Sequence, residues 1–175
     1  MGTVLLDQVI QTDYGQFDLG WSIPFGFDGH FDRFFAGQVN GLVGAADASG
    51  VYLHFARRYG GSRVRIELVA QAPDPQFEPR EDVVEVSVAI PEGAHPRWSS
   101  WAGEDGGSLL IPAGTYRLRV SARGRDAGRN GGEFAEGVVD SYLLELWPAP
   151  IEPDEVLRVG SADATYWHRE IGGRR

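Results

Sequence analysis

Two tryptophans stand beside two acidic residues in a polar stretch near the middle of the chain. Trp98 and Trp101 lie in PRWSSW (residues 96–101), and Glu104 and Asp105 follow in EDGG (residues 104–107). Tryptophans surrounded by polar groups are typical of the hot spots of protein–protein interfaces. One hypothesis is therefore a partner-binding site made by Trp98, Trp101, Glu104 and Asp105. The alternative is that both rings fold back over a sheet.

A second candidate site consists of arginines on one strand. Arg117, Arg119 and Arg123 share a face if this part of the chain is a regular strand, because side chains alternate between the two faces. Guanidinium groups bind anions through paired hydrogen bonds, so these residues are candidates for binding a small anionic ligand. The competing interpretation, which the acidic composition favours, is that they pair across strands with carboxylates.

Aromatic residues are concentrated between residues 17 and 35, which hold seven of the chain's 20 aromatic side chains. Such a segment could form a groove for a ligand or for a loop of a partner protein. It could instead be a long connection that its rings pin onto one end of the fold. The residues are Phe17, Trp21, Phe25, Phe27, Phe31, Phe34 and Phe35.

Several catalytic chemistries have no residues to support them. Cysteine is absent, which excludes a thiol nucleophile and a cysteine-ligated metal. No two of the four histidines have the spacing of a metal-binding helix, and His54 alternates onto the outward face of its strand, where we expect it at the surface. A stretch from Asp126 resembles a calcium loop but has Gly128 and Gly137 where oxygen ligands belong. We therefore predict a protein that is not an enzyme and uses no metal and no cofactor.

The charge balance indicates the kind of partner. The chain has 25 acidic and 16 basic residues and a formal net charge of −9. A negative surface repels phosphate backbones, so direct binding to nucleic acid is not expected. The same field speeds the encounter with a basic protein, for example the cationic face of a nuclease.

The sequence contains few features that indicate a cellular location or a division into several domains. No segment approaches the roughly 18 apolar residues of a membrane span, and the first ten residues lack the pattern of a signal peptide. We therefore expect a cytoplasmic protein without membrane contact. The 175 residues suit a single domain over residues 1–175, with a C-terminal tail from about residue 151.

Strands must position these candidate sites. Alternating polar and apolar residues predict strands over residues 51–56, 63–68, 84–90, 116–121 and 142–147. Gly60 and Gly61 predict a hairpin between the first two. Turn residues between short strands are typical of an all-β fold, which we expect to be an antiparallel β-sandwich of seven to ten strands. Residues 32–40 are the best helix candidate, residues 124–137 read as a loop, and residues 155–167 as a last strand or ordered tail.

Five stretches, in this order, carry a family resemblance. They are VIQTDYGQF (residues 9–17), GLVGAAD (41–47), VVEVSVAI (83–90), IPAGTYRL (111–118) and DSYLLEL (140–146). Together they resemble the competence protein J family, small proteins that inhibit a DNA-entry nuclease. The resemblance covers about residues 5–147 and implies an inhibitory role, but no inhibitory residue can be carried across. The loop at 124–137 and the tail beyond residue 150 depart from the family layout.

These observations converge on a binding role. We predict a non-catalytic acidic protein, an inhibitor or immunity-type partner of a nuclease or toxin, which covers a basic surface with acidic side chains flanked by aromatic rings. The alternative is a ligand-binding β-sandwich for a carbohydrate or a small anion. An enzyme built around a histidine and scattered carboxylates is a third possibility. We expect a monomer or a homodimer, because an edge strand can pair two copies.

Overall fold

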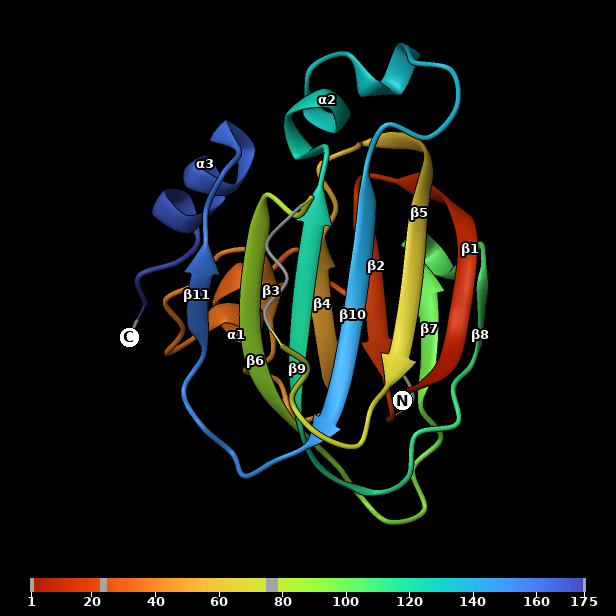
Figure 1. Cartoon of the computed structure of the whole chain (residues 1–175), viewed down its shortest axis with the longest axis vertical. Coiled ribbons are helices and arrows are strands. Elements are labelled where there is room, and N and C mark those ends of the chain that lie inside the picture. The colour runs from red at the N-terminus through yellow and green to blue at the C-terminus, as the bar shows by residue number, and fades with distance from the viewer. Residues whose placement is uncertain (1, 23–24, 75–78, 175) are drawn as a thin grey trace.

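Two β-sheets pack face to face, with the helices at one end and on one side (Figure 1). The computed structural model describes residues 2–22, 25–74 and 79–174. Sheet A has six strands in the order β1 (Thr3–Asp13), β5 (Tyr59–Leu68), β10 (Ser141–Pro148), β9 (Gly114–Arg123), β6 (Asp82–Ile90) and β11 (Glu155–Arg158). Sheet B has five, in the order β3 (Val43–Gly44), β4 (Gly50–His54), β2 (Gln16–Gly20), β7 (Arg97–Ser100) and β8 (Gly106–Ser108).

The all-β class is confirmed, with eleven strands in the described part of the chain. This number lies just above the expected seven to ten, because β3 and β8 are only two and three residues long and leave no periodic pattern in the sequence. The described neighbours are antiparallel except β5 and β10, which run parallel. The arrangement is thus a mostly antiparallel sandwich.

The predicted hairpin at Gly60 and Gly61 is wrong. Strand β4 belongs to sheet B and β5 to sheet A, and both glycines lie within β5, paired with Thr12 and Gln11 of β1. The chain between the two strands crosses from one sheet to the other. Gly60 has a φ of +127°, and a side chain there would collide with the buried guanidinium of Arg57. The glycine therefore marks a close approach and not a turn.

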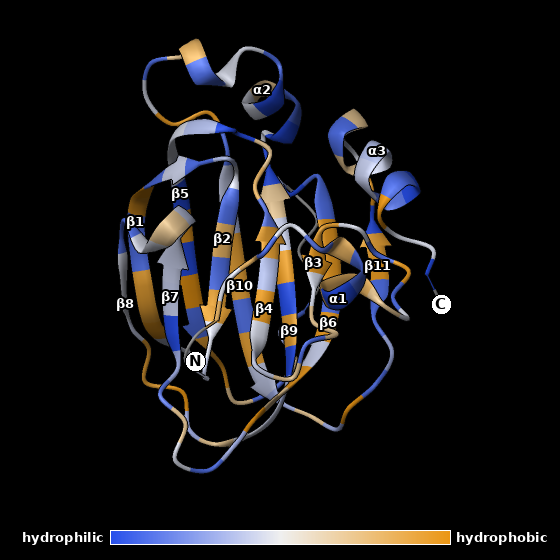
Figure 2. Cartoon of the chain, turned by 180° about the vertical axis from the view of Figure 1, so that it is seen from behind, coloured by the Kyte–Doolittle hydropathy of each residue, from blue (hydrophilic) through white to orange (hydrophobic). Residues whose placement is uncertain are grey.

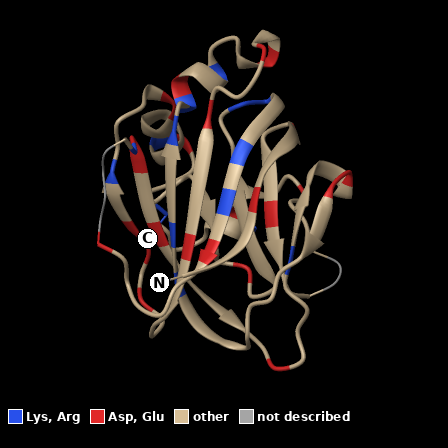
Figure 3. Ribbon diagram, turned by 45° about the vertical axis from the view of Figure 1, so that its right-hand side comes forward, with Lys and Arg blue, Asp and Glu red and all other residues tan. Residues whose placement is uncertain are grey.

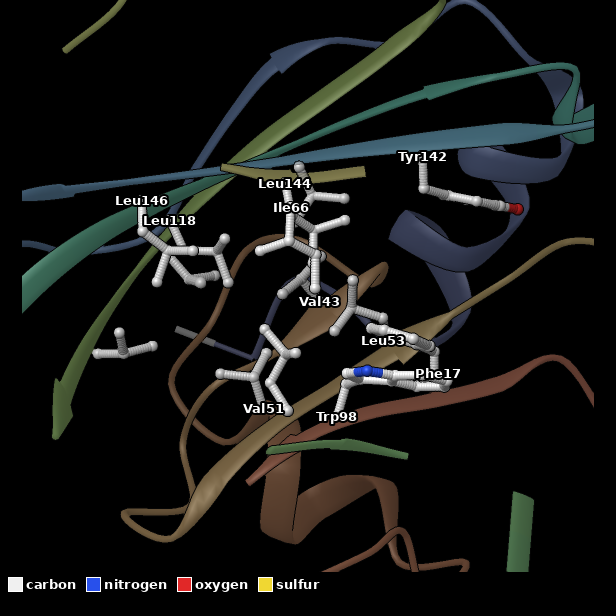
Figure 4. Close-up of a cluster of buried hydrophobic side chains, with 14 of the residues drawn as sticks. Phe17, Val43, Val51, Leu53, Ile66, Trp98, Leu118, Tyr142, Leu144 and Leu146 are labelled. Atoms are coloured by element: carbon white, nitrogen blue, oxygen red, sulfur yellow. The ribbon is translucent and has the colours of Figure 1, made fainter. Parts of the chain in front are cut away.

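The core lies between the sheets (Figure 4). Sheet A contributes residues such as Ile66, Leu118 and Leu144, and sheet B contributes Phe17 and Leu53, all of them buried. The ring of Phe17 stacks on the rings of Phe55 and Trp98, with centroids 5.0 and 5.9 Å away. Each large apolar side chain buried in this way stabilises the fold by about 1.5–3 kcal/mol.

The helices differ from the expectations at their bounds. Helix α1 covers Phe31–Phe35 instead of residues 32–40, and Gly37, at a φ of +74°, lies just beyond its end. The expected loop at 124–137 contains α2 (Arg125–Arg129) and the short 3-10 helix η2 (Gly132–Phe134). The C-terminal segment forms β11 and then α3 (Ala162–Glu170). None of the helices in the described part is long and apolar enough to span a bilayer.

Buried polar contacts fasten the helices to the sandwich. Arg125 of α2 forms an ion pair with Asp163 of α3 at 2.7 Å and donates a hydrogen bond to the backbone oxygen of His54. Ser161 caps α3 by accepting from the Ala164 amide, and its hydroxyl donates to Asp82 of β6. Residues far from α3 in sequence, Asp82 of sheet A and Arg125 of α2, therefore hold the helix in place.

Residues 25–35 and α3 cover part of the outer face of sheet B, where α1 lies in front of β3 (Figure 2). Phe34 and Phe35 are buried there against Tyr52 of β4 and Ile171. The rings of Phe25, Phe27 and Phe31 are only partly buried. The aromatic segment thus pins a long connection to the sheet and also leaves rings at the surface.

Candidate partner-binding groove

The register of sheet B places a row of polar side chains on its outer face. Asp18 of β2 is paired with Tyr52 of β4 on one side and with Ser99 of β7 on the other, and Gln16 is paired with His54. Because side chains alternate along a strand, these groups point away from the core that Phe17, Leu53 and Trp98 occupy. Three strands therefore hold the row rigidly in place.

Two neighbouring cavities lie over this row. The first, of about 540 Å³, is lined by Gln16, Asp18, Phe25, Phe27, His95, Arg97 and Trp101, among others. The second, of about 490 Å³, is lined by Tyr14, Phe27, Phe31, Tyr52, His54, Asp163 and Trp167, among others. Phe27 borders both, and the Tyr14 and Trp101 rings, one from each cavity, have centroids 5.0 Å apart. We call the two cavities together the aromatic groove.

Asp18 is the most unusual group in the groove. Its side chain is only 1% exposed. Oδ2 accepts a hydrogen bond of 2.6 Å from Nε2 of Gln16, whereas Oδ1 has no hydrogen-bond partner. No cation pairs with the carboxylate among the residues that the structure describes. Burial raises the pKa of Asp18 to about 6, and the polar contacts with the Gln16 side chain and the Phe27 backbone oppose the rise.

His54 lies beneath the other half of the groove and is not the surface residue that we expected. Its ring stacks on Trp167 of α3 at 4.4 Å and on Phe31 at 5.2 Å. The Tyr52 hydroxyl lies 3.1 Å from Nδ1, and Nε2 has no partner. Burial, assisted by the nearby Arg125, lowers the pKa of His54 to about 3, so the ring is neutral. The expectation failed because α1 and α3 cover a face that the strand pattern alone leaves open.

The four residues proposed from the sequence for partner binding do not lie together. Trp98 points into the core. Trp101 starts the 3-10 helix η1 (Trp101–Gly103), is partly buried, and lines the groove. Glu104 and Asp105 are exposed in the turn that leads to β8. Trp101, Ala102 and Gly103 thus line the groove, and the exposed Glu104 and Asp105 directly follow them in the chain, so we call residues 101–105 the rim of the groove. Trp98 lies in the core, on the opposite side of β7.

The three arginines proposed for ligand binding also separate. Arg117 and Arg119 are buried on the outer face of sheet A, and both pair with Glu85, at 3.0 and 2.8 Å. Arg123 is exposed and lines a different cavity of about 520 Å³, whose charged lining includes the basic Arg63, Arg65 and Arg80 and the acidic Asp7, Glu67 and Glu145. Basic and acidic residues are interspersed over the molecule and do not form separate poles (Figure 3).

Sequence reasoning missed Gln16, Asp18 and Tyr52. A signal was present, because Gln16 and Asp18 alternate with the apolar Phe17 and Leu19. Such alternation ordinarily indicates a solvated face. The unusual burial of Asp18 arises from the aromatic segment that returns over β2. Within the described part of the chain, no cluster of acidic residues and histidines could hold a metal ion.

No protein-family model and no curated protein matches the sequence. Solved structures with the same fold do match. ComJ from Bacillus subtilis, described as an inhibitor of the DNA-degrading activity of NucA, is 18% identical, with a TM-score of 0.58, over 85% of this chain and 99% of ComJ. The protein described as crocagin biosynthetic gene J is 15% identical, with a TM-score of 0.52, over 86% of this chain and 99% of its own. The resemblance to the competence protein J family is therefore confirmed as a weak structural one: this chain shares the fold of ComJ.

Proposed function

We propose that this chain is a non-catalytic binding protein that inhibits a DNA-degrading nuclease, with the aromatic groove and its rim as the interface. The observation that carries the proposal is the groove itself, which partly buried rings line and which ends at Gly103, directly before the exposed Glu104 and Asp105. ComJ, which has this fold, is a nuclease inhibitor, and the net charge of −9 suits a basic partner. The proposal extends to this chain a role that is known for a protein of the same fold.

Inhibition of this kind needs no bond to be made or broken. The DNA-binding surface of a nuclease is basic, because it must neutralise phosphates. Acidic side chains on the rim can occupy that surface in place of DNA, and the rings of Trp101 and Phe27 supply contact area from which water is excluded. The long-range attraction accelerates association and is screened by salt.

Capture followed by an activity assay tests the proposal. The immobilised chain is exposed to a lysate of the source organism at low salt, bound protein is released at high salt, and the DNA-degrading activity of the released fraction is titrated with the free chain. We expect a basic nuclease whose activity falls as the chain is added. A captured fraction without nuclease activity, or with activity that the chain does not reduce, contradicts the proposal.

Matched variants locate the interface. Trp101→Ala and the double variant Glu104→Gln/Asp105→Asn should weaken inhibition about tenfold or more, because they remove a large ring and two rim charges. The control is Glu152→Gln/Glu155→Gln, which makes the same charge change at exposed residues next to and within β11. Equal effects of the two double variants would place the interface elsewhere.

A second candidate function is anion binding by the cavity on the outer face of sheet A. Arg123 and Arg80 line it and form no ion pair within the described residues. A phosphate or a carboxylate could accept hydrogen bonds from both guanidinium groups. Inorganic phosphate that binds the native chain and not Arg123→Gln supports this function, whereas equal binding by both excludes it.

The remaining attributes belong to the same proposal. We propose one domain over residues 1–175 that acts in the cytoplasm as a monomer or a homodimer, with no direct contact to nucleic acid. Light scattering during size-exclusion chromatography measures the oligomeric state, and a titration with DNA in the absence of nuclease tests the last point.

A further inference from the structure

The aromatic groove contains a carboxylate that the fold leaves unsatisfied. The other buried carboxylates in the described part of the chain accept hydrogen bonds and leave no buried oxygen without a partner: Asp82 accepts from Ser161, Asp140 from Ser62 and Tyr142, Asp154 from Asn40, Asp163 from Arg125, and Glu85 from Arg117 and Arg119. Asp18, equally buried, differs because one of its oxygens, Oδ1, has no partner. A buried polar atom without a partner usually costs about 1–3 kcal/mol, more if charged, and therefore calls for an explanation.

We propose that Asp18 receives a guanidinium group, an arginine side chain that the partner protein inserts into the groove. The inference deepens the proposed function and rests on it for the identity of the partner. The position is favourable because β2 lies between β4 and β7, so the carboxylate is held by a strand with neighbours on both sides. It lines the cavity of about 540 Å³, into which the flexible stem of an arginine would carry the guanidinium group.

The walls of the cavity favour a guanidinium group over a compact cation. Phe25, Phe27 and Trp101 line it together with Asp18. A guanidinium group is planar, stacks on aromatic faces and presents a fork of donors that matches a carboxylate. Arg97 of this chain borders the same cavity, but one of its guanidinium nitrogens lies beside Gly106, and within the described residues it forms no ion pair with Asp18. The position opposite the carboxylate is thus left for a group from outside.

Entry requires one exchange of hydrogen bonds. The free Oδ1 atom is closed to water, and the Gln16 amide is the side-chain donor to Oδ2. An entering guanidinium would displace this amide and replace a bond from a neutral donor with charge-assisted bonds, which are roughly twice as strong. The Gln16 side chain lines the cavity and can turn toward it when it is released. The exchange therefore gains attraction without leaving the carboxylate bare.

A small-molecule probe tests this step without any nuclease. The full chain is titrated at neutral pH with N-acetyl-arginine methylamide and, separately, with the citrulline analogue, which has the same shape but no charge. Binding is followed by chemical-shift changes in NMR spectra. We expect the arginine probe to bind at least about tenfold more tightly than the citrulline probe. Equal affinities in the native chain overturn the inference, and this comparison does not depend on the folding of any variant.

A pair of variants then assigns the effect to Asp18. Asp18→Asn removes the charge and keeps the shape, and it should reduce the affinity for the arginine probe to that of the citrulline probe. Asp28→Asn makes the same change at an exposed carboxylate that pairs with Arg33, and it should leave the affinity unchanged. Equal losses in both variants contradict the inference.

The outcomes also separate the inference from the proposed function. Arginine binding that depends on Asp18, without inhibition of any captured nuclease, supports the site and refutes the nuclease as its partner. Inhibition that depends on Trp101 but not on Asp18, with no preference for arginine over citrulline, supports the inhibitor and refutes the inserted arginine.

Discussion

Replacing Asp18 by asparagine should stabilise the folded chain at neutral and alkaline pH. The folded protein holds Asp18 where burial raises its pKa from 3.8 to about 6, so the folded state binds the proton more tightly than the unfolded state does. The carboxyl group therefore favours folding below a pH of about 4 and loses this contribution as the pH rises through about 6. An asparagine side chain at this position has no charge to desolvate and no such pH dependence.

The size of the effect follows from the two pKa values. A tenfold change in an ionisation constant corresponds to about 1.4 kcal/mol, so at about pH 8 the ionised Asp18 should lower the free energy of unfolding by about 3 kcal/mol. At about pH 4 the same relation gives only about 0.5 kcal/mol. The advantage of Asp18→Asn should therefore grow by about 2.5 kcal/mol between the two pH values.

Urea denaturation of both proteins at the two pH values measures this difference. Any packing or hydrogen-bond change that the asparagine introduces is independent of pH and cancels in the comparison, as do the titrations of all other groups. The same variant should lose its affinity for the arginine probe, so stability and binding move in opposite directions, as is common at binding sites. An advantage that does not change with pH would refute the argument that Asp18 is a desolvated carboxylate.

Three further variants probe the parts of the fold that hold the groove. Asp163→Ala leaves the buried Arg125 without its ion pair and should lower the free energy of unfolding, measured by urea denaturation, by about 3–5 kcal/mol. Arg129→Met, which removes the more exposed partner of Asp163, should lower it by about 1 kcal/mol or less. Arg57→Met removes hydrogen bonds to the backbone oxygens of Gly132, Ala135 and Gly137, so limited proteolysis should cut residues 132–137 faster, which Arg58→Met should not change. Gly41→Ala places a methyl group against the backbone oxygen of Trp167, so it should displace α3 and lower the melting temperature by several degrees. Gly26→Ala is the control and should not lower it, because the nearest atom lies 3.9 Å from the added methyl carbon.

Local pattern was sufficient wherever a strand has apolar residues on one face and polar residues on the other. The alternation in residues 84–90, 116–121 and 142–147 predicted β6, β9 and β10, and these strands are adjacent at the centre of sheet A. Period-two alternation depends only on which face of a strand packs against the apolar core, so neighbouring residues are enough to reveal it. The all-β class follows from several such segments separated by turn residues, and the acidic charge follows from composition alone.

Pairing between strands was decided by the tertiary structure. Gly60 and Gly61 look like a turn in sequence, yet β4 and β5 belong to different sheets because the short segment between them crosses the sandwich. The parallel pairing of β5 with β10 joins residues more than 70 positions apart, and nothing local specifies it. Arg117 and Arg119 share a face and pair with a carboxylate across strands, as the acidic composition favoured, but which carboxylate they share could not be predicted, because Glu85 lies 32 positions before Arg117 in the chain.

The groove also combines features that the sequence indicates with features that only the tertiary structure decides. His54 was expected on the outward face of its strand, which the structure confirms, but no strand was predicted at Gln16 and Asp18, although both alternate with apolar residues. Their burial cannot be read there, because residues 25–35 and the ring of Trp167, more than 100 positions along the chain, return to cover them. Desolvation depends on everything packed around a group and not on its neighbours in sequence. The sequence therefore contains the alternation that turns these residues outward, and only the tertiary structure made one of them an unpaired carboxylate at the bottom of a groove.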